Sequence, residues 1–297
     1  MPSDAVIDAL APDPAAGKPS APARSGGGRE IVLRVVSAAI MVPAGLWVVH
    51  AGGWWIIWGT GICAMLAAGE WVRMASGLPN GMTRLLVTLV MAAGVAAAVY
   101  FAPSGLENVG LAALATAVAG ALLAKAGKGS AASMVLGAVY VCLPFGMFVW
   151  IRHAAPDGRM TLFAILAIVW ATDIAAYFAG RGFGGPLLSP KDSPNKTWTG
   201  AIGAVTCAAL AGGAVARAYG GDFMHWLVAS IVLSVVAQAG DLLESRFKRL
   251  YGVKDSSGLV PGHGGVLDRL DALMAATVLA AVVIRFAPAL APGFGAR

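Results

Sequence analysis

Charged side chains gather in one stretch of an otherwise apolar chain of 297 residues. Between positions 241 and 271 lie five of the 15 acidic residues, namely Asp241, Glu244, Asp255, Asp268 and Asp271. The same stretch holds five of the 21 lysines and arginines, namely Arg246, Lys248, Arg249, Lys254 and Arg269. Carboxylates bind hard cations such as Mg²⁺, and lysine and arginine bind phosphate oxygens. The stretch therefore indicates phosphate chemistry assisted by a divalent cation.

Two pairs of carboxylates repeat one spacing. Asp241, Glu244 and Ser245 stand at i, i+3 and i+4, so a helix would place them on one face. Asp268 and Asp271 repeat the i, i+3 spacing. We interpret the four acids as a metal site, because clustered carboxylates that hold cations suit phosphoryl and nucleotidyl transfer. The alternatives are a solvated helix end with a local ion pair for the first pair, and compensation of a helix dipole for the second.

A glycine-rich turn and two lysines lie between these pairs. In the turn at 261–265, Gly262, Gly264 and Gly265 would let a phosphate approach backbone N–H groups closely. His263 is suited to hydrogen-bond or protonate a phosphate oxygen, and the alternative is a structural hydrogen bond that holds the turn. Lys248 and Lys254 are the candidates for contacts to a triphosphate. Their alternative is a topology signal, since basic loops are common at membrane surfaces.

A second stretch, 173–200, adds further candidates. Asp173 lies inside an apolar run, where an ionisable side chain indicates function unless it has a buried hydrogen-bonding role. Arg181, Lys191 and Lys196 follow, and two prolines stiffen the segment around the lysines. We therefore expect these cations to be held in place.

The composition predicts the elements that position these residues. Hydrophobic residues make up 58% of the chain and charged residues 12%, with a mean hydropathy of +0.76, whereas a soluble domain has about 25% charged residues. These values predict an all-α, polytopic integral membrane protein. Nine apolar stretches are candidate transmembrane helices: 31–49, 52–69, 85–101, 109–124, 131–150, 160–179, 200–216, 223–243 and 272–291.

The distribution of lysine and arginine predicts the orientation. With the N-terminus in the cytoplasm, 16 of the 21 basic residues fall in cytoplasmic segments and 5 on the other side, which favours an N-in, C-out arrangement. The connections 180–199 and 244–270 then lie on the same, cytoplasmic face. A site built from both would be accessible to cytosolic nucleotides and to the inner leaflet. Because basic residues follow this pattern, the net charge of +6 does not indicate nucleic acid. Residues 1–28, rich in Ala, Pro, Ser and Gly, are predicted to be a disordered tail.

These motifs resemble those of the phosphatidate cytidylyltransferase (CDP-diacylglycerol synthase) family. The resemblance rests on Ser245, Lys248-Arg249, Lys254-Asp255, the turn at 261–265 and Asp268-Arg269-Leu270-Asp271. It extends to the elements at 180–184 and 193–198. Thr199 and Ala272 depart from the family, which often has Glu and Ser there. The specific likeness covers 173–200 and 238–272, inside a membrane-embedded domain that we predict to span residues 29–297.

The resemblance implies that CTP and phosphatidate react to CDP-diacylglycerol and pyrophosphate, in a multi-pass protein of the bacterial inner membrane. It implies Mg²⁺ as cofactor on Asp241 and Asp268, with Asp271 and Glu244 supporting and a second cation left open. Catalytic roles are predicted for Asp241, Asp268, Asp271, Lys254 and His263. Substrate-binding roles are predicted for Ser245, Lys248, Asp255, Gly262, Gly264, Gly265, Arg269, Asp173, Arg181 and Lys196. The expected partners are CTP, phosphatidate and inner-leaflet lipids, with a homodimer left open and no nucleic acid.

Two other classes of function are compatible with a polytopic chain. A CTP-dependent lipid-alcohol kinase would release CDP instead of pyrophosphate, but the order of the motifs from Lys254-Asp255 to Asp271 argues against it. A transporter would spread polar residues through several spans and would often repeat its architecture. Here the charges are concentrated in two connections, so a transporter is disfavoured.

Overall fold

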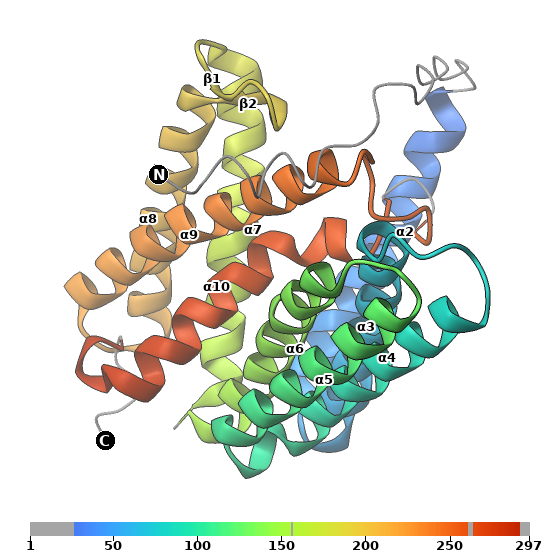
Figure 1. Cartoon of the computed structure of the whole chain (residues 1–297). Coiled ribbons are helices and arrows are strands. Elements are labelled where there is room, and N and C mark those ends of the chain that lie inside the picture. The colour runs from blue at the N-terminus through green and yellow to red at the C-terminus, as the bar shows by residue number, and fades with distance from the viewer. Residues whose placement is uncertain (1–26, 156, 261–263, 292–297) are drawn as a thin grey trace, which may run out of the picture.

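The computed structural model describes residues 27–155, 157–260 and 264–291, and this part of the chain is mostly helical (Figure 1). It contains nine α-helices of at least 20 residues. They are α2 (Gly27–Ala51), α3 (Gly53–Ala75), α4 (Met82–Phe101), α5 (Leu106–Ala126), α6 (Ala131–Ala154), α7 (Gly158–Phe183), α8 (Trp198–Tyr219), α9 (Phe223–Leu250) and α10 (Leu267–Phe286). The shorter elements are the 3-10 turns η1 (Ala102–Ser104) and η2 (Pro288–Leu290) and the strands β1 (Leu187–Ser189) and β2 (Ser193–Thr197).

Each of the nine predicted apolar stretches coincides with one of these helices. Seven of them, α3 to α9, are long and apolar enough to cross a membrane. The apolar part of α2 is shorter, Val35–Ala51, and α10 has three charged residues in its first turns. The prediction of an all-α, polytopic membrane protein is confirmed. The count of nine crossings and the N-in, C-out orientation stay predictions, and the predicted tail lies outside the described residues except for Gly27 and Gly28, which belong to α2.

Several predicted helix ends were wrong, and the differences fall at the charged stretches. Helix α9 continues past position 243 to Leu250, and α10 begins at Leu267 instead of 272. The connection is therefore 251–266, and most of the charged candidates lie on helices. Hydropathy marks only where apolar residues stop, whereas basic residues in the last turn of α9 and Asp268 in the first turn of α10 favour continued helix. At its other end α10 stops at Phe286, ahead of Pro288, so the predicted end at 291 was also wrong.

Polar side chains start several helices by accepting a hydrogen bond from a backbone N–H of the first turn. This local signal explains where α7, α8 and α9 begin. The N-cap side chains are Asp157, which accepts from Met160 N at 3.2 Å, Thr197, which accepts from Gly200 N at 3.2 Å, and Asp222, which accepts from His225 N at 2.8 Å. Thr197 is both the last residue of β2 and the N-cap of α8. Its hydrogen bond therefore fixes the stretch 173–200 next to the helices.

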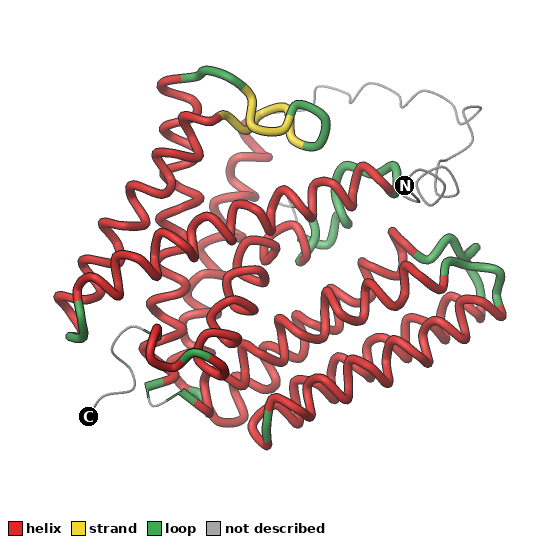
Figure 2. Tube along the Cα trace, turned by 60° about the vertical axis from the view of Figure 1, so that its left-hand side comes forward, coloured by secondary structure: helices red, strands yellow, loops and turns green. Residues whose placement is uncertain are grey.

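The helices form two groups that meet at α6 (Figures 1 and 2). One group is α3, α4, α5 and α6, and the other is α7, α8, α9 and α10. Helix α6 joins them because it also contacts α7 and α10. Small residues permit the close approach of helices in a membrane. At the α9–α10 contact, a Cβ added to Gly240 would meet the Ala275 Cβ and lie 3.0 Å from the Asp271 carbonyl oxygen.

An antiparallel hairpin of β1 and β2, which was not predicted, connects α7 to α8. Its register pairs Leu187 with Thr197 and Ser189 with Ser193. Strand β2 contacts α9, and the Arg249 side chain donates to the Asp192 carbonyl at 3.4 Å. The hairpin, which lies at the top of the molecule in Figure 1, thus brings the 173–200 stretch into contact with α9.

Replacing Gly240 tests the packing of α9 on α10. We expect Gly240→Ala to lower the free energy of unfolding by about 1–3 kcal/mol, because the added methyl overpacks the contact. The measurement is unfolding of the purified protein in detergent. Gly110→Ala is the matched control, since Gly110 is exposed on α5 and an added Cβ meets nothing within 4 Å. Equal stability of the two variants would contradict the packing described here.

Candidate active site

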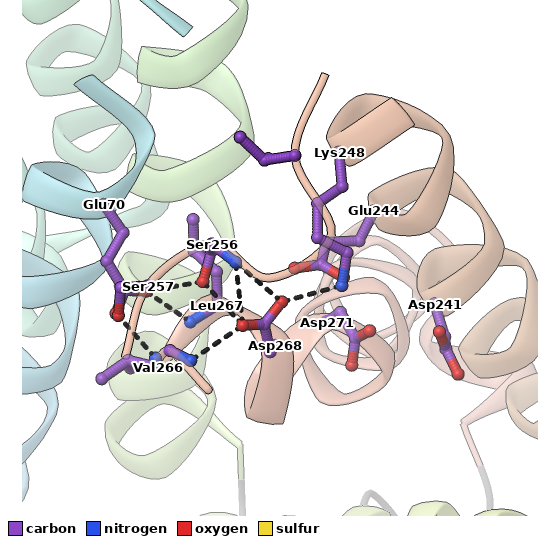
Figure 3. Close-up of polar contacts among 12 residues, drawn as sticks. Glu70, Asp241, Glu244, Lys248, Ser256, Ser257, Val266, Leu267, Asp268 and Asp271 are labelled. Atoms are coloured by element: carbon purple, nitrogen blue, oxygen red, sulfur yellow. Dashed lines mark hydrogen bonds and ion pairs between the residues drawn. The ribbon is translucent and has the colours of Figure 1, made fainter. Parts of the chain in front are cut away.

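The last turns of α9, the first turn of α10 and the connection between them enclose a cluster of charges (Figure 3). Lys248 is its centre. The Lys248 Nζ lies 2.5 Å from Glu244 Oε2, one turn earlier on α9, and 2.7 Å from Asp268 Oδ1 on α10. The exposed fractions of these side chains are 13%, 2% and 4%. A buried ammonium therefore joins the two helices through two carboxylates.

Asp268 also receives hydrogen bonds from the connection that precedes it. Its Oδ2 accepts from Ser256 N at 3.0 Å, from Ser256 Oγ at 3.0 Å and from Gly265 N at 2.8 Å. Since the donors stand near both ends of the connection, one carboxylate closes the loop. Both Asp268 oxygens are thus used within the protein, one mainly by the loop and the other by Lys248.

Asp241 connects the charged stretch 241–271 with the stretch 173–200. Its Oδ2 lies 2.5 Å from the Nζ of Lys196, which belongs to β2 of the hairpin. The two side chains are 33% and 28% exposed, so this ion pair is much more accessible than the one at Lys248. Asp271 is buried on α10, and Figure 3 shows its carboxylate in the same region as those of Asp241, Glu244 and Asp268.

The donor chemistry of this region suits a hard cation, because four carboxylates lie on the last turns of α9 and the first turns of α10. Within the described residues, both carboxylate oxygens of Glu244 are buried and receive no hydrogen bond, although Lys248 is an ion-pair partner. In the same part of the chain, no three histidines, cysteines or acids are grouped closely enough to hold a metal ion. The lysines instead pair with the acids, so the predicted ligand set of Asp241, Glu244, Asp268 and Asp271 stays a prediction.

Other predicted residues lie around this cluster with varying exposure. Ser245 is partly buried on α9, while Lys254 and Asp255 are exposed on the connection and Arg269 is exposed on α10. On α7, Asp173 and Arg181 are exposed, and the Arg181 guanidinium lies 3.4 Å from the Tyr177 hydroxyl.

The glycine-rich turn is only partly described. Gly264 forms an isolated antiparallel bridge with Val260, and its φ of 84° suits glycine. Gly265 is buried and donates to Asp268, as stated above. Gly262 and His263 lie outside the described residues, so their predicted roles stay predictions.

Glu70 on α3 is a site residue that was not predicted from the sequence. The structure buries this side chain at 3% exposure, and its carboxylate accepts hydrogen bonds from the 256–267 segment. The signal was only partial, because Glu70 directly follows the predicted apolar stretch 52–69, whereas α3 continues to Ala75 and so places Glu70 within the helix. No motif around it pointed to the distant loop that it contacts.

Together, the bundle and this cluster define a membrane-embedded protein with cations and carboxylates suited to phosphate chemistry. Residues 32–287 match the cytidylyltransferase family, and the chain belongs to this family.

Curated relatives support the assignment across most of the chain. A phosphatidate cytidylyltransferase of Brucella suis is 35% identical over 257 residues, which cover 83% of this chain and 90% of the relative. One of Pseudomonas aeruginosa is 32% identical over 266 residues, covering 84% and 96%. One of Bacillus subtilis is 37% identical over 143 residues, covering 48% and 53%.

The bridge at Lys248 predicts a large effect on stability. We expect Lys248→Met to destabilise the fold by about 3–5 kcal/mol, because it leaves the buried Glu244 and Asp268 without their cation. The measurement is denaturant unfolding in mixed micelles. Lys125→Met is the control, because Lys125 is exposed at the end of α5 and a surface change away from such contacts costs about 0.5 kcal/mol or less.

A double-mutant cycle separates the ion pair from other losses. In Glu244→Gln/Lys248→Met the total destabilisation should be smaller than the sum of the single changes, because the second substitution removes the unpaired charge. Additive effects would contradict a direct bridge between these side chains.

Proposed function

We infer that this chain transfers the cytidylyl group of CTP to phosphatidate and releases CDP-diacylglycerol and pyrophosphate. Membership of the cytidylyltransferase family and the names of the curated relatives support this reaction. The observation that carries it is the meeting of the stretches 173–200 and 241–271, where Lys196 of the hairpin pairs with Asp241 beside the Lys248–Asp268 bridge. The enzyme works as a multi-pass protein of the bacterial inner membrane, for which we propose the N-in, C-out orientation.

The charge of the site suits an incoming cation. The acids outnumber the lysines that pair with them, since Asp241, Glu244, Asp268 and Asp271 stand against Lys196 and Lys248. We propose that these four acids hold Mg²⁺, which neutralises phosphate charge and orients the triphosphate when bound. A second cation stays an open alternative.

The chemical step joins two anions. A phosphate oxygen of phosphatidate forms a bond to the α-phosphorus of CTP while the bond to the bridging oxygen breaks and pyrophosphate leaves. Lys248, Lys254 and Arg269 stabilise the charge that gathers on the leaving group. A phosphate monoester has a second pKa of about 6, so the attacking group needs no strong general base near neutral pH. Asp255 and His263 are therefore proposed as positioning groups.

An apolar cavity that could take the acyl chains of phosphatidate begins about two turns of α9 from Asp241 and extends toward the start of α9 and the end of α10, away from the site. This cavity of about 600 Å³ lies between α6, α7, α9 and α10, and its lining includes Ile168, Leu233 and Leu279. Leu233 and Asp241 are both on α9, separated by roughly 12 Å along the helix axis. A lipid whose phosphate reaches Asp241 can therefore extend its hydrocarbon toward the cavity. Assembly of the enzyme as a homodimer stays an open alternative.

Asp268→Asn tests the proposed chemistry. With CTP, Mg²⁺ and phosphatidate in detergent, the wild-type protein should form CDP-diacylglycerol and pyrophosphate in equal amounts. The variant should lose activity by about 100-fold or more, because it removes a carboxylate proposed to hold the Mg²⁺ that stabilises transition-state charge. Unfolding of both proteins shows whether the variant is folded.

Glu107→Gln is the matched control, since Glu107 is an exposed carboxylate in the first turn of α5 and should leave activity unchanged. Release of CDP instead of pyrophosphate would indicate the lipid-alcohol kinase. Near-normal activity of a folded Asp268→Asn protein would refute the proposed role of this carboxylate.

A further inference from the structure

Glu70 holds the connection between α9 and α10 from the other group of helices. It lies on α3, and its carboxylate receives four hydrogen bonds (Figure 3). Oε1 accepts from Ser257 Oγ at 2.5 Å and from Val266 N at 2.9 Å. Oε2 accepts from Ser256 Oγ at 3.2 Å and from Leu267 N at 2.9 Å. Each oxygen is therefore bonded to one serine hydroxyl and one backbone N–H.

The two backbone donors belong to the start of α10. The first N–H groups of a helix have no partner within the helix and need an acceptor. The N-cap residue Val266 has no side-chain acceptor to offer, so a carboxylate from a distant helix takes that place. Its negative charge also favours the positive end of the helix dipole. Glu70 thus caps the helix that carries Asp268 and Asp271.

The Ser256 hydroxyl couples Glu70 to Asp268 directly. It lies 3.2 Å from Glu70 Oε2 and 3.0 Å from Asp268 Oδ2, and has one proton to donate to the two carboxylates. Arg73, one turn after Glu70, donates to the Ser256 carbonyl at 3.1 Å. Ser256 is therefore held by its hydroxyl and its carbonyl from α3, while its N–H is bonded to Asp268.

Gly265 makes room for this contact. A Cβ built on Gly265 would meet the Ser256 hydroxyl and lie 2.6 Å from Glu70 Oε1. Close approach of a phosphate was the reason predicted for a glycine at this position, and the contact with Glu70 and Ser256 is a second reason. A side chain at 265 would push Glu70 away from the start of α10.

We propose that Glu70 is a positioning residue of the site, which sets the place of Asp268 by capping α10 and fixing Ser256. The proposal rests on the proposed cytidylyl transfer. Its physical basis is that both carboxylate oxygens must accept. In Glu70→Gln the amide NH₂ replaces one of these oxygens, and on either side it faces a backbone N–H that can only donate. The start of α10 then loses an acceptor, and Asp268 shifts with it.

The test combines kinetics with hydrogen exchange of the purified full-length protein in detergent. For Glu70→Gln we expect kcat to fall by about tenfold or more, since small misplacements of reacting groups are costly, while the KM for phosphatidate changes by less than about twofold. Amide exchange should rise in the segment 256–270 and stay unchanged in α5. Glu70→Asp keeps the charge but is one methylene shorter, so it should recover part of kcat. Glu107→Gln is the control and should match the wild type.

Ser256→Ala supplies an independent arm, because it removes the shared hydroxyl and leaves Glu70 in place. The combined effect of Glu70→Gln and Ser256→Ala on kcat should be smaller than the product of the single effects. If Glu70→Gln does not fold, Ser257→Ala, which removes one donor to Glu70, should give a smaller change of the same kind. A kcat within twofold of wild type in folded Glu70→Gln, or unchanged exchange in 256–270, would overturn the proposal. If the wild type makes no CDP-diacylglycerol, the proposed function fails, while the exchange data still decide whether Glu70 positions the loop.

Discussion

The ion bridge from Glu244 through Lys248 to Asp268 is the interaction on which the site depends. It places three charged groups in a nearly water-free position, where each ion loses several kcal/mol of hydration. The arrangement is tolerable only because the ammonium contacts both carboxylates and because backbone N–H groups of the loop are also bonded to Asp268. The bridge therefore fixes α9 against α10, and the carboxylate that joins the two helices also binds Ser256 and Gly265 of their connection.

The two groups of helices have different tasks. The predicted site residues lie on α7, the hairpin, α9, α10 and the connection before α10, whereas α3 to α6 contribute none of them. Their contribution is to hold that connection. Glu70 and Arg73 bind it from α3, and on α6 the Ser133 hydroxyl accepts from Tyr251 at 2.9 Å. The first group is thus the fixed surface against which the charged loop is positioned.

Hydropathy predicted the helices well because a membrane imposes one pattern, a long apolar run, on every crossing element. It predicted the ends of α9 and α10 poorly, since charged turns can extend a helix beyond its apolar part. The four acids and two lysines of the site were found from local spacing and family likeness. The ion pair between Lys196 and Asp241 could not be predicted. It depends on the β1–β2 hairpin, whose sequence has no alternation of apolar residues that would indicate strands. Glu70 was missed for a related reason, since its partners lie 186 to 197 positions away.

The tertiary cap on α10 also orders events during biosynthesis. Helix α3 emerges from the ribosome long before the 256–267 segment, so the acceptor for the α10 N–H groups is already in the bilayer when they arrive. Until α10 docks, Glu70 lacks the two backbone donors that α10 brings, Val266 N and Leu267 N. Docking of α10 therefore completes a set of contacts whose acceptor was made with α3, so the start of α10 reaches its final place only when both groups of helices are assembled.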